Sequence, residues 1–391
     1  METRMTHLED SNALIAVVEL LAENGFEGMA EAMQILLNEA MKLQRSAALG
    51  AQPYERSKTR RGHANGFKPK SVNSRLGKLA LSVPQTRGVE FYPSALERGE
   101  RSERALKLAI AEMYVQGVST RKVAAITEEL CGLDISSSQV SRASQLLDEE
   151  LDAWRNRPLS ECPYLILDAR YEKIRHGGSV VSCAVLLAIG ITPDGKRSVL
   201  GVSVSLSEAE VHWREFLASL QQRGLHGVRY IVSDGHAGLK EARQARFSGV
   251  PWQRCQFHLQ QNAMQYVPKV AMREQVGDDL RNVFNAPDRS EAERQLQLLV
   301  RKYAKSAPKL VAWLETDLPE GLTVFGLPAA HRRKMRTTNM LERINKELKR
   351  RTRVATLFPN EASTLRLVSA VLSEITEDWE TGKIYLNMET D

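Results

Sequence analysis

The length, composition and charge of the chain exclude several classes of protein. Its 391 residues exceed one ordinary domain and predict two or three. With 42% hydrophobic and 26% charged residues, the chain is neither disordered nor fibrous, and its net charge of +6 favours a polyanionic partner.

The apolar stretches are too short for export or membrane insertion. Residues 13–18 are flanked by Glu, Asp and Asn, unlike a secretory signal, and residues 180–191 fall short of the roughly 20 residues that a membrane-spanning helix needs. The widely scattered Cys131, Cys162, Cys183 and Cys255 suit free thiols in a reducing compartment. We therefore expect a cytoplasmic, nucleoid-associated protein with no membrane partner.

Positive charge is concentrated in two segments. Residues 56–70 hold six Lys or Arg and no acid, and residues 331–353 hold ten against two acids, Glu342 and Glu347. A single charge run is usually a solvated face, but two concentrated runs favour a nucleic acid partner. The candidate DNA contacts from these runs are Arg56, Lys58, Arg60, Arg61, Lys68, Lys70, Arg343, Lys346, Lys349, Arg350 and Arg351.

Residues 1–45 are predicted to be helical. Apolar residues recur there at intervals of three and four, at Met29, Met33, Leu36, Leu37, Ala40 and Met41. This stripe packs either against its own chain or against a second copy. We favour the second copy, and therefore a homodimer, because a basic, Gly-containing stretch separates these helices from the rest of the chain.

Residues 46–100 are predicted to form a basic arm and a small β-hairpin that bind DNA. The stretch "RSKTRRGHANGFKPK" has no hydrophobic period and indicates an arm or loop. In "GKLALSVPQTRGVEFYP", Leu79, Leu81 and Val83 alternate, residues 84–88 suit a turn, and Val89 and Phe91 alternate again.

Residues 101–158 are predicted to contain a helix-turn-helix that binds DNA. Ser119 suits the start of a helix, Gly132 its end, and Ser136 with Gln139 form a capping box that opens a second helix. Gln139 and Arg142 on that second helix are able to contact phosphates or base edges. Because many helical hairpins share this pattern, it indicates DNA contact only weakly.

Residues 159–256 have the pattern of the first part of a ribonuclease-H-like core, which makes the fold class α/β. The segment "YLILD" predicts a buried strand that ends on Asp168. "VVSCAVLLAIG" and "SVLGVSVS" predict two more strands, joined by a turn at Asp194 and Gly195. A helix over residues 208–222 and the strand "VRYIVSD", which ends on Asp234, follow.

The remaining sequence is mostly helical. Residues 257–322 are predicted to be a helical insertion, and residues 323–391 the second part of the core. That second part would resume with strand structure near Val324 and continue with the helix "TTNMLERINKELKRR" and a final helix over residues 361–379.

Asp168 and Asp234 are candidate metal ligands. Each is placed at the end of a predicted strand, 66 residues apart, and adjacent parallel strands would bring them together. Each also has a simpler interpretation, since Asp168 could merely end its strand and Asp234 cap the next helix. Clustered carboxylates at neutral pH imply a cation, and oxygen ligands favour two Mg²⁺ (or Mn²⁺) ions roughly 4 Å apart, which suit phosphodiester chemistry.

Glu342 is the third candidate, and a cap competes with this role. Asn339 and Glu342 have capping-box spacing, which is compatible with a metal role. Leu341, Ile344 and Leu348 would form the buried stripe of the helix, and Glu342 and Asn345 lie on another face together with its cations. A cap has no need of so many neighbouring cations, whereas a carboxylate directed at DNA does.

The pair Cys255 and His258 has the spacing of half a zinc site. A complete site needs four ligands, and the sequence offers no second pair at suitable spacing. We therefore expect a structural, hydrogen-bonded pair beside the active site.

The motifs "LDARYEKIR", "VSDGHAGL", "WQRCQFH" and "TTNMLERINKELKRR", in this order, resemble the Mutator-type transposases of bacterial insertion sequences. "NGFKPK", "MYVQGVSTRKV" and "SSSQVSR" extend the resemblance over nearly the whole chain. The resemblance implies a DDE triad of Asp168, Asp234 and Glu342 as catalytic and metal-binding residues. It also implies DNA cleavage and strand transfer at terminal inverted repeats by a dimer. A DNA-binding regulator that cuts nothing and a purely hydrolytic nuclease remain the alternatives.

Overall fold

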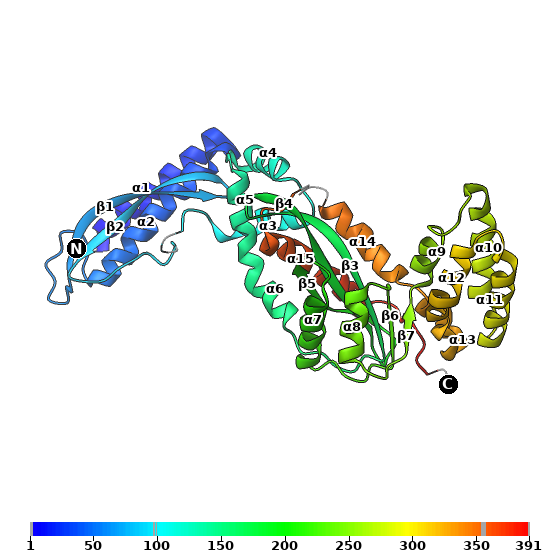
Figure 1. The fold of residues 1–391 in the computed structure, drawn as a ribbon. Helices are drawn as coiled ribbons and strands as arrows, with labels where there is room; N and C mark the ends of the chain where they lie inside the picture. Colours follow the sequence, from blue (N-terminus) through cyan, green and yellow to red (C-terminus); the bar gives the residue numbers. More distant parts are fainter. Residues whose placement is uncertain (1–2, 97, 99, 353–356, 390–391) are drawn as a thin grey trace. The chain divides into compact units, whose positions relative to one another are not determined.

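A computed structural model describes residues 3–96, 98, 100–352 and 357–389 (Figure 1). The chain forms two compact units, Met1–Leu146 and Leu147–Asp391, and each is described by itself. None of the helices in the described ranges combines the length and apolar character required to cross a membrane.

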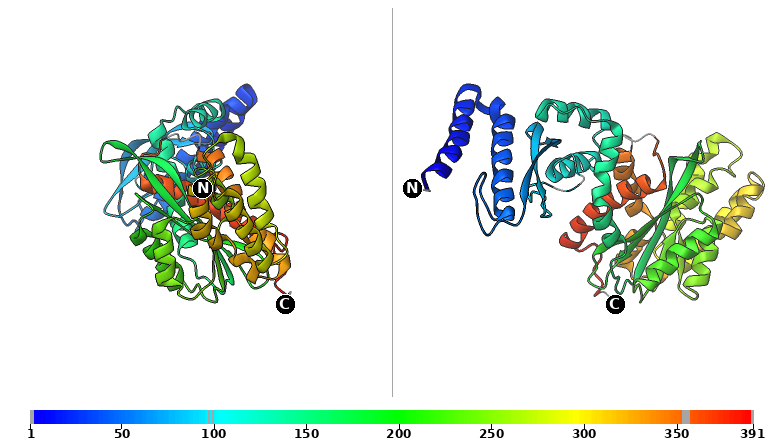
Figure 2. Two further views of the ribbon diagram at one scale, coloured as in Figure 1. Left: turned by 45° about the vertical axis from the view of Figure 1, so that its right-hand side comes forward. Right: turned by 90° about the vertical axis from the view of Figure 1, so that its left-hand side faces the viewer.

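The first unit opens with two helices and a hairpin. The helices are α1 (Thr3–Asn24) and α2 (Met29–Leu49), joined by a short 3-10 helix, Gly25–Gly28. The strands β1 (His63–Ser74) and β2 (Gly77–Arg87) pair antiparallel, and the hairpin lies along α2 (Figure 2).

The predicted hairpin was wrong in its pairing. Strand β2 contains the alternating Leu79, Leu81 and Val83, but its partner is the preceding segment, which we predicted to be an unpaired arm. The turn therefore lies between Ser74 and Gly77 rather than at residues 84–88. Most side chains of β1 are exposed, so the strand is held mainly by its backbone ladder and its sequence shows no hydrophobic period.

The apolar stripe of α2 packs against its own chain. Met41 is buried with Leu79, Leu81 and Val83 of β2, and Met33 and Leu37 pack beside them. Most of the stripe therefore packs within the chain, the option that we did not favour, while Leu36 remains 42% exposed.

The predicted helix-turn-helix is present in the first unit. Helix α3 (Arg104–Val115) precedes α4 (Thr120–Cys131) and α5 (Ser137–Ser144). The Ser119 side chain accepts a hydrogen bond from the Lys122 backbone N–H, Gly132 ends α4 in the left-handed conformation, and Ser136 and Gln139 form both bonds of the capping box. Local capping chemistry was sufficient to predict these boundaries.

The second unit contains a five-stranded mixed sheet in the order β5-β4-β3-β6-β7. The strands are β3 (Tyr164–His176), β4 (Ser179–Ile191), β5 (Arg197–Ser205), β6 (Tyr230–Ser233) and β7 (Trp252–Arg254). Strands β3, β4 and β5 form an antiparallel meander, while β6 and β7 continue the sheet parallel to β3.

Side chains of β3 alternate between two cores. Leu165 and Leu167 pack with α7 (Glu210–Gln222) and α8 (Ala237–Arg246), which cover one face of the sheet (Figure 1). Ile166 packs on the other face with apolar residues of the later helices. This period of two explains why the strand is buried on both faces.

Helices dominate the rest of the second unit. They are α6 (Asp148–Arg155), α9 (Gln256–Ala263), α10 (Arg273–Phe284), α11 (Arg289–Tyr303), α12 (Pro308–Asp317), α13 (Ala329–Met335), α14 (Asn339–Thr352) and α15 (Glu361–Thr381). Three short 3-10 helices also occur, Val270–Met272, Leu318–Gly321 and Thr323–Gly326.

Two sequence predictions for this unit need correction. Asp168 does not end its strand, because β3 continues to His176 through antiparallel pairing with β4. No strand begins near Val324, where the structure has the 3-10 helix Thr323–Gly326, and the fifth strand of the sheet is the short β7, which the sequence analysis did not predict.

Candidate active site

Asp168 lies on strand β3, and Asp234 directly follows the neighbouring parallel strand β6. Strand β3 pairs with β6 at Tyr164 and Tyr230 and at Ile166 and Val232, always at an offset of 66 residues. Asp168 and Asp234 have the same offset, two residues beyond the last pair. The predicted parallel pairing of the two strands is therefore confirmed, and the charge of Asp234 reaches Asp168. Asp168 is buried, with 8% of its surface exposed, and Asp234 is partly exposed.

Asp234 is not the cap of the following helix. The N-cap of α8 is His236, and Oδ1 of Asp234 accepts a hydrogen bond of 2.6 Å from the Gly235 backbone N–H. The carboxylate is thus held by its own loop and faces His258, whose Nδ1 lies 3.8 Å from Asp234 Oδ1. That distance suits an ion pair and is too long for a hydrogen bond.

Cys255 and His258 connect strand β7 to this carboxylate pair. Cys255 is buried at the N-terminus of α9, and its backbone N–H donates to the Ser233 carbonyl at 2.8 Å. Its Sγ accepts hydrogen bonds from the backbone N–H and Oγ1 of Thr338, both at 3.4 Å. Cys255 therefore fixes the end of β6 and the segment that leads into α14.

The environment changes the acidity of these groups. Burial raises the pKa of Asp168 to about 6, and the charge of Asp234 adds to this, while His258 and a hydrogen bond from Asn345 oppose it. Hydrogen bonding with Cys255 raises the pKa of His258 to about 9, despite burial, and Asp234 contributes further. Burial acts to raise the pKa of Cys255, but hydrogen bonds involving His258 and Thr338 outweigh it and lower that pKa. At neutral pH His258 is therefore a cation beside two carboxylates.

Helix α14 carries Glu342 between two anchored residues. Thr338 precedes the helix and contacts Cys255, while Nδ2 of Asn345 donates to Oδ2 of Asp168 at 3.2 Å. Glu342 is one turn after Thr338 and one turn before Asn345, so the three residues share one side of the helix. Oε1 of Glu342 is buried and has no hydrogen-bond partner in the described structure.

The cap that competes with this role is not formed. A capping box requires the Glu342 side chain to accept from the Asn339 backbone N–H. That N–H donates instead to Oγ1 of Thr337, at 3.4 Å, and the Glu342 N–H donates to the Thr338 carbonyl at 3.2 Å. The carboxylate is thus available for another partner.

The donor chemistry fits a hard divalent cation. One carboxylate lies on β3 and a second directly follows the parallel strand β6, and a third presents a buried, unpartnered oxygen from helix α14. Within the described residues, no three His, Cys, Asp or Glu side chains are close enough to form a ready-made metal site.

The structure also identifies residues that the sequence analysis did not assign to the site. Asn345 bonds Asp168, and its Oδ1 is buried without a partner in the described part of the chain. Arg170 of β3 donates to the Asn345 carbonyl at 2.8 Å and pairs with Glu172. Asn345 could have been found from its spacing, three residues after Glu342, whereas the partner of Arg170 depends on tertiary structure.

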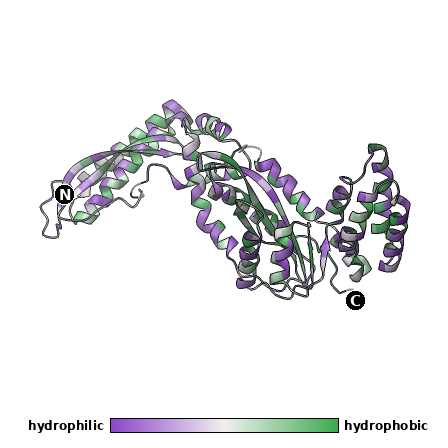
Figure 3. Cartoon of the chain, in the orientation of Figure 1, coloured by the Kyte–Doolittle hydropathy of each residue, from purple (hydrophilic) through white to green (hydrophobic). Residues whose placement is uncertain are grey.

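The predicted DNA contacts on α14 differ in their accessibility. Lys346, Lys349 and Arg350 are exposed, although Arg350 also pairs with Glu347. Arg351 is buried and pairs with Glu347 and with Glu374 of α15, so we assign it to helix packing instead. The side chain of Arg343 lies outside the described residues. Figure 3 shows that α14 is largely hydrophilic.

The candidates in the first unit also differ. Arg56, Lys58, Arg61 and Lys68 are exposed, as is Arg142, whose Nε also donates to the Ser138 carbonyl at 3.3 Å. The others have partners in the protein: Arg60 donates to the carbonyls of Gln52 and Glu55, Lys70 to the Tyr92 hydroxyl, and Gln139 accepts the Ser136 N–H of the capping box.

Comparison with known proteins identifies the family. The family described as "Transposase, Mutator family" matches residues 3–382, so the chain belongs to the Mutator family of transposases. It is an insertion-sequence transposase, an enzyme that transfers DNA strands. Transposases of this DDE type generally use divalent metal ions, and the activity implies DNA binding.

Relatives match the chain over nearly its whole length. It is 58% identical over 380 residues to the transposase for insertion sequence element IS406 of Burkholderia multivorans, covering 97% of this chain and 98% of that protein. It is 43% identical to the transposase for ISRM5 of Rhizobium meliloti, over 98% of this chain and 96% of that protein. It is 37% identical to the transposase for IS256 in transposon Tn4001 of Staphylococcus aureus, over 90% and 92%.

Proposed function

We propose that Asp168, Asp234 and Glu342 are the catalytic and metal-binding residues of this transposase. The observation that carries this assignment is the position of Glu342, whose buried and unpartnered Oε1 lies between the contacts of α14 to Cys255 and to Asp168. An unpartnered buried carboxylate oxygen is costly unless a ligand satisfies it. A divalent cation is the ligand that this donor set fits best.

The sheet supports the finer fold prediction of a ribonuclease-H-like core. An antiparallel meander followed by parallel strands on the far side of its first strand is the arrangement expected of that fold. The core would be formed by residues 159–256 and 323–391, with residues 257–322 as the helical insertion. Residues 46–100 and 101–158 were predicted to bind DNA. The end of the second range, helix α6, belongs to the second unit, where Asp148 of α6 accepts a hydrogen bond from Arg366 of α15.

The reaction follows from phosphodiester chemistry. Water breaks a phosphodiester at the terminal inverted repeat and leaves a 3′ hydroxyl, which attacks a phosphodiester of the target and releases another 3′ hydroxyl. One P–O bond forms as one breaks, so the joining step needs no ATP. When bound, two Mg²⁺ or Mn²⁺ ions would activate the attacking oxygen and stabilise the leaving one.

The residues of the chain hold this site in place. Asn345 orients Asp168, Cys255 and Thr338 fix the start of α14, and His258 places a positive charge beside Asp234. The exposed Lys346 and Lys349 are one and two turns along the helix from Glu342 and would neutralise DNA phosphates near the carboxylates.

We also propose that the active form is a homodimer that holds two DNA ends. Because most of the α2 stripe packs on the hairpin, the exposed Leu14, Ile15 and Val18 of α1 are the better candidates for the contact between copies. Sedimentation of the protein with and without terminal DNA tests this proposal.

The test of the catalytic assignment uses end-labelled duplex that contains the terminus of the element. Wild type, Glu342→Gln and Glu347→Gln are compared in Mg²⁺ and in EDTA. We expect wild type and Glu347→Gln to nick and join strands only in Mg²⁺, and Glu342→Gln to bind DNA equally and lose at least about 100-fold in both steps. Glu347 is the matched control because it is the other acid of α14 and pairs with arginines.

Each other outcome identifies an alternative. Cleavage by Glu342→Gln at the wild-type rate would show that Glu342 is not a ligand. Nicks without joined strands would identify a hydrolytic nuclease, and binding without nicks in the wild type would identify a regulator.

A further inference from the structure

The loop between α2 and β1, residues 50–62, is held in a defined shape. The Arg60 guanidinium donates to the carbonyls of Gln52, at 3.2 Å, and Glu55, at 2.5 Å. Oγ1 of Thr59 donates to the Gly50 carbonyl at 2.9 Å. These bonds cross the loop from side to side, so it presents its outward side chains in fixed positions.

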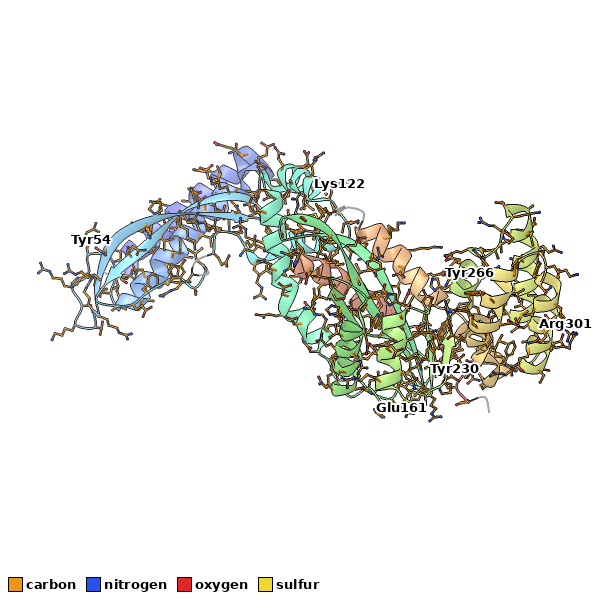
Figure 4. All side chains as sticks on the ribbon, viewed as in Figure 1. Tyr54, Lys122, Glu161, Tyr230, Tyr266 and Arg301 are labelled. Carbon is orange, nitrogen blue, oxygen red and sulfur yellow. The ribbon has the colours of Figure 1, made fainter. Side chains whose placement is uncertain are left out.

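Tyr54 occupies the outer part of this loop in an unusual conformation. Its exposed fraction is 103%, and Figure 4 labels it on the loop. It is the one non-glycine residue in the described ranges with a positive φ, at 61°. An L-residue in the left-handed region is strained, and a fully exposed aromatic ring contributes nothing to folding. The conformation therefore favours a role outside the folding of the chain.

The surroundings of Tyr54 are strongly basic. The loop and β1 line a hollow of about 840 Å³ that Tyr54 shares with Arg45, Arg56, Lys58, Arg60 and His63. Arg56 and Lys58 are exposed, and Arg45 lies with its guanidinium 4.9 Å from the centre of the Phe67 ring. The one acid in the lining, Glu55, accepts a hydrogen bond from the Gln52 backbone N–H at 2.7 Å. The hollow thus combines an exposed aromatic face with cations, and its charge is complementary to a polyanion.

We propose that this loop binds DNA by stacking the Tyr54 ring on a base while Arg56 and Lys58 bind the flanking phosphates. Aromatic rings with interleaved cations are the combination that recognises an unstacked base together with its backbone. The stacked base lies at a free end or at a distorted step of the duplex, because bases inside a regular duplex have no free face. This inference rests on the proposed function only in taking DNA as the partner.

The test compares Tyr54→Gly, Tyr54→Asn and Tyr54→Phe with wild type. Gly and Asn both tolerate a positive φ, so each variant removes the ring without straining the loop, and we expect their melting temperatures to equal or exceed that of the wild type. Phe26→Ala is the matched control, because Phe26 is an exposed aromatic residue of the same unit that does not line the basic hollow.

Binding is measured by fluorescence titration of terminal duplexes with 2-aminopurine at successive positions. We expect Tyr54→Gly and Tyr54→Asn to lose roughly 10- to 100-fold in affinity and to abolish the fluorescence change at one position, while Tyr54→Phe and Phe26→Ala behave as wild type. The salt dependence separates the two kinds of contact. The slope of affinity against salt concentration should be unchanged in the Tyr54 variants. In Lys58→Ala it should fall by the amount that corresponds to about one phosphate contact.

Three results would overturn the proposal. The first is wild-type affinity for DNA in both Tyr54→Gly and Tyr54→Asn. The second is a loss of affinity in Phe26→Ala equal to that in the Tyr54 variants. The third is a loss of dimerisation in the Tyr54 variants that accounts for their weaker binding. Failure of the proposed function would give a different result. Wild-type protein would then bind the terminal duplex through Tyr54 but would not cut it.

Discussion

Asn345 joins helix α14 to strand β3 by donating a hydrogen bond from Nδ2 to Oδ2 of Asp168 at 3.2 Å. Arg170 of the same strand donates to the Asn345 carbonyl, so Asn345 is attached to β3 at two residues, Asp168 and Arg170, which are two positions apart. Glu342 is one turn earlier on α14. The position of the third carboxylate relative to the first therefore depends on Asn345.

Replacing Asn345 should reduce activity more than stability. In Asn345→Leu, a side chain of similar size loses its bond to Asp168, and we expect cleavage to fall by about 10- to 100-fold, as is usual when a residue that orients a ligand is lost. The free energy of unfolding should change by only about 1 kcal/mol. The variant loses the hydrogen bond that Nδ2 of Asn345 donates, but it also loses the buried Oδ1, which has no partner, and the two effects partly cancel. The two measurements are cleavage of terminal duplex and unfolding in urea. Asn339→Leu, at an exposed position of the same helix, is the control for both. Equal losses of activity in the two variants would contradict this role.

The burial of Asp168 predicts a pH dependence. Its pKa is raised to about 6 from an ordinary value of 3.8, so the folded, metal-free protein binds a proton that the unfolded chain releases at lower pH. The contribution of Asp168 to the free energy of unfolding is therefore largest below about pH 4 and falls as pH rises to about 6. Urea unfolding in EDTA should show this fall in the wild type and not in Asp168→Asn.

His258 should shift the pH range in which the site binds metal. Its charge lowers the pKa of Asp168, so in His258→Asn that pKa rises further above 6. Because a protonated carboxyl does not bind the cation, the midpoint pH of Mn²⁺ binding should move upward in His258→Asn. Titration of Mn²⁺ followed by electron paramagnetic resonance from pH 5 to pH 8 measures this midpoint. An unchanged midpoint would show that His258 does not act on Asp168.

Replacing each of two neighbouring arginines of α14 should affect a different property, stability in one case and DNA binding in the other. Arg351 is buried between Glu347 and Glu374, so Arg351→Met should lower the free energy of unfolding by about 2 kcal/mol. Arg350 is exposed, so Arg350→Met should weaken DNA binding and reduce its salt dependence with little effect on unfolding. If folded Arg351→Met bound DNA more weakly than the wild type and with a smaller salt dependence, Arg351 would be a DNA contact after all.

Features that nearby residues determine could be predicted from the sequence, whereas features that depend on distant contacts could not. Ser119, Gly132 and Ser136 have capping roles that depend on residues within five positions, and these boundaries were predicted. The offset of 66 residues between Asp168 and Asp234 was correct because parallel strands keep a constant register. The pairing of β1 with β2 was missed because exposed side chains leave no pattern when a backbone ladder forms the strand.

The site itself was only partly predictable. The face of α14 that carries Glu342 and Asn345 follows from helical periodicity, so the sequence was enough to place them together. The bond from Asn345 to Asp168 crosses 177 positions of the chain, and the contact of Thr338 with Cys255 crosses 83. Such contacts are decided by how α14 docks on the sheet, which no local pattern encodes.

Gly238 should be intolerant of even one added methyl group. It follows Asp234 by four residues, and a Cβ there would lie 2.5 Å from the Glu208 carbonyl oxygen and 2.8 Å from the Glu210 backbone nitrogen. Both are backbone atoms, so α8 would have to move away from the start of α7, and the loop that carries Asp234 would move with it. We expect Gly238→Ala to lower the free energy of unfolding by about 2 kcal/mol and to weaken Mn²⁺ binding. In Gly326→Ala the new Cβ meets open space at an ordinary φ, so that variant should match or slightly exceed the wild type in unfolding and match it in Mn²⁺ affinity. If Gly238→Ala were as stable as Gly326→Ala, the close approach of α8 and α7 would not be what positions Asp234.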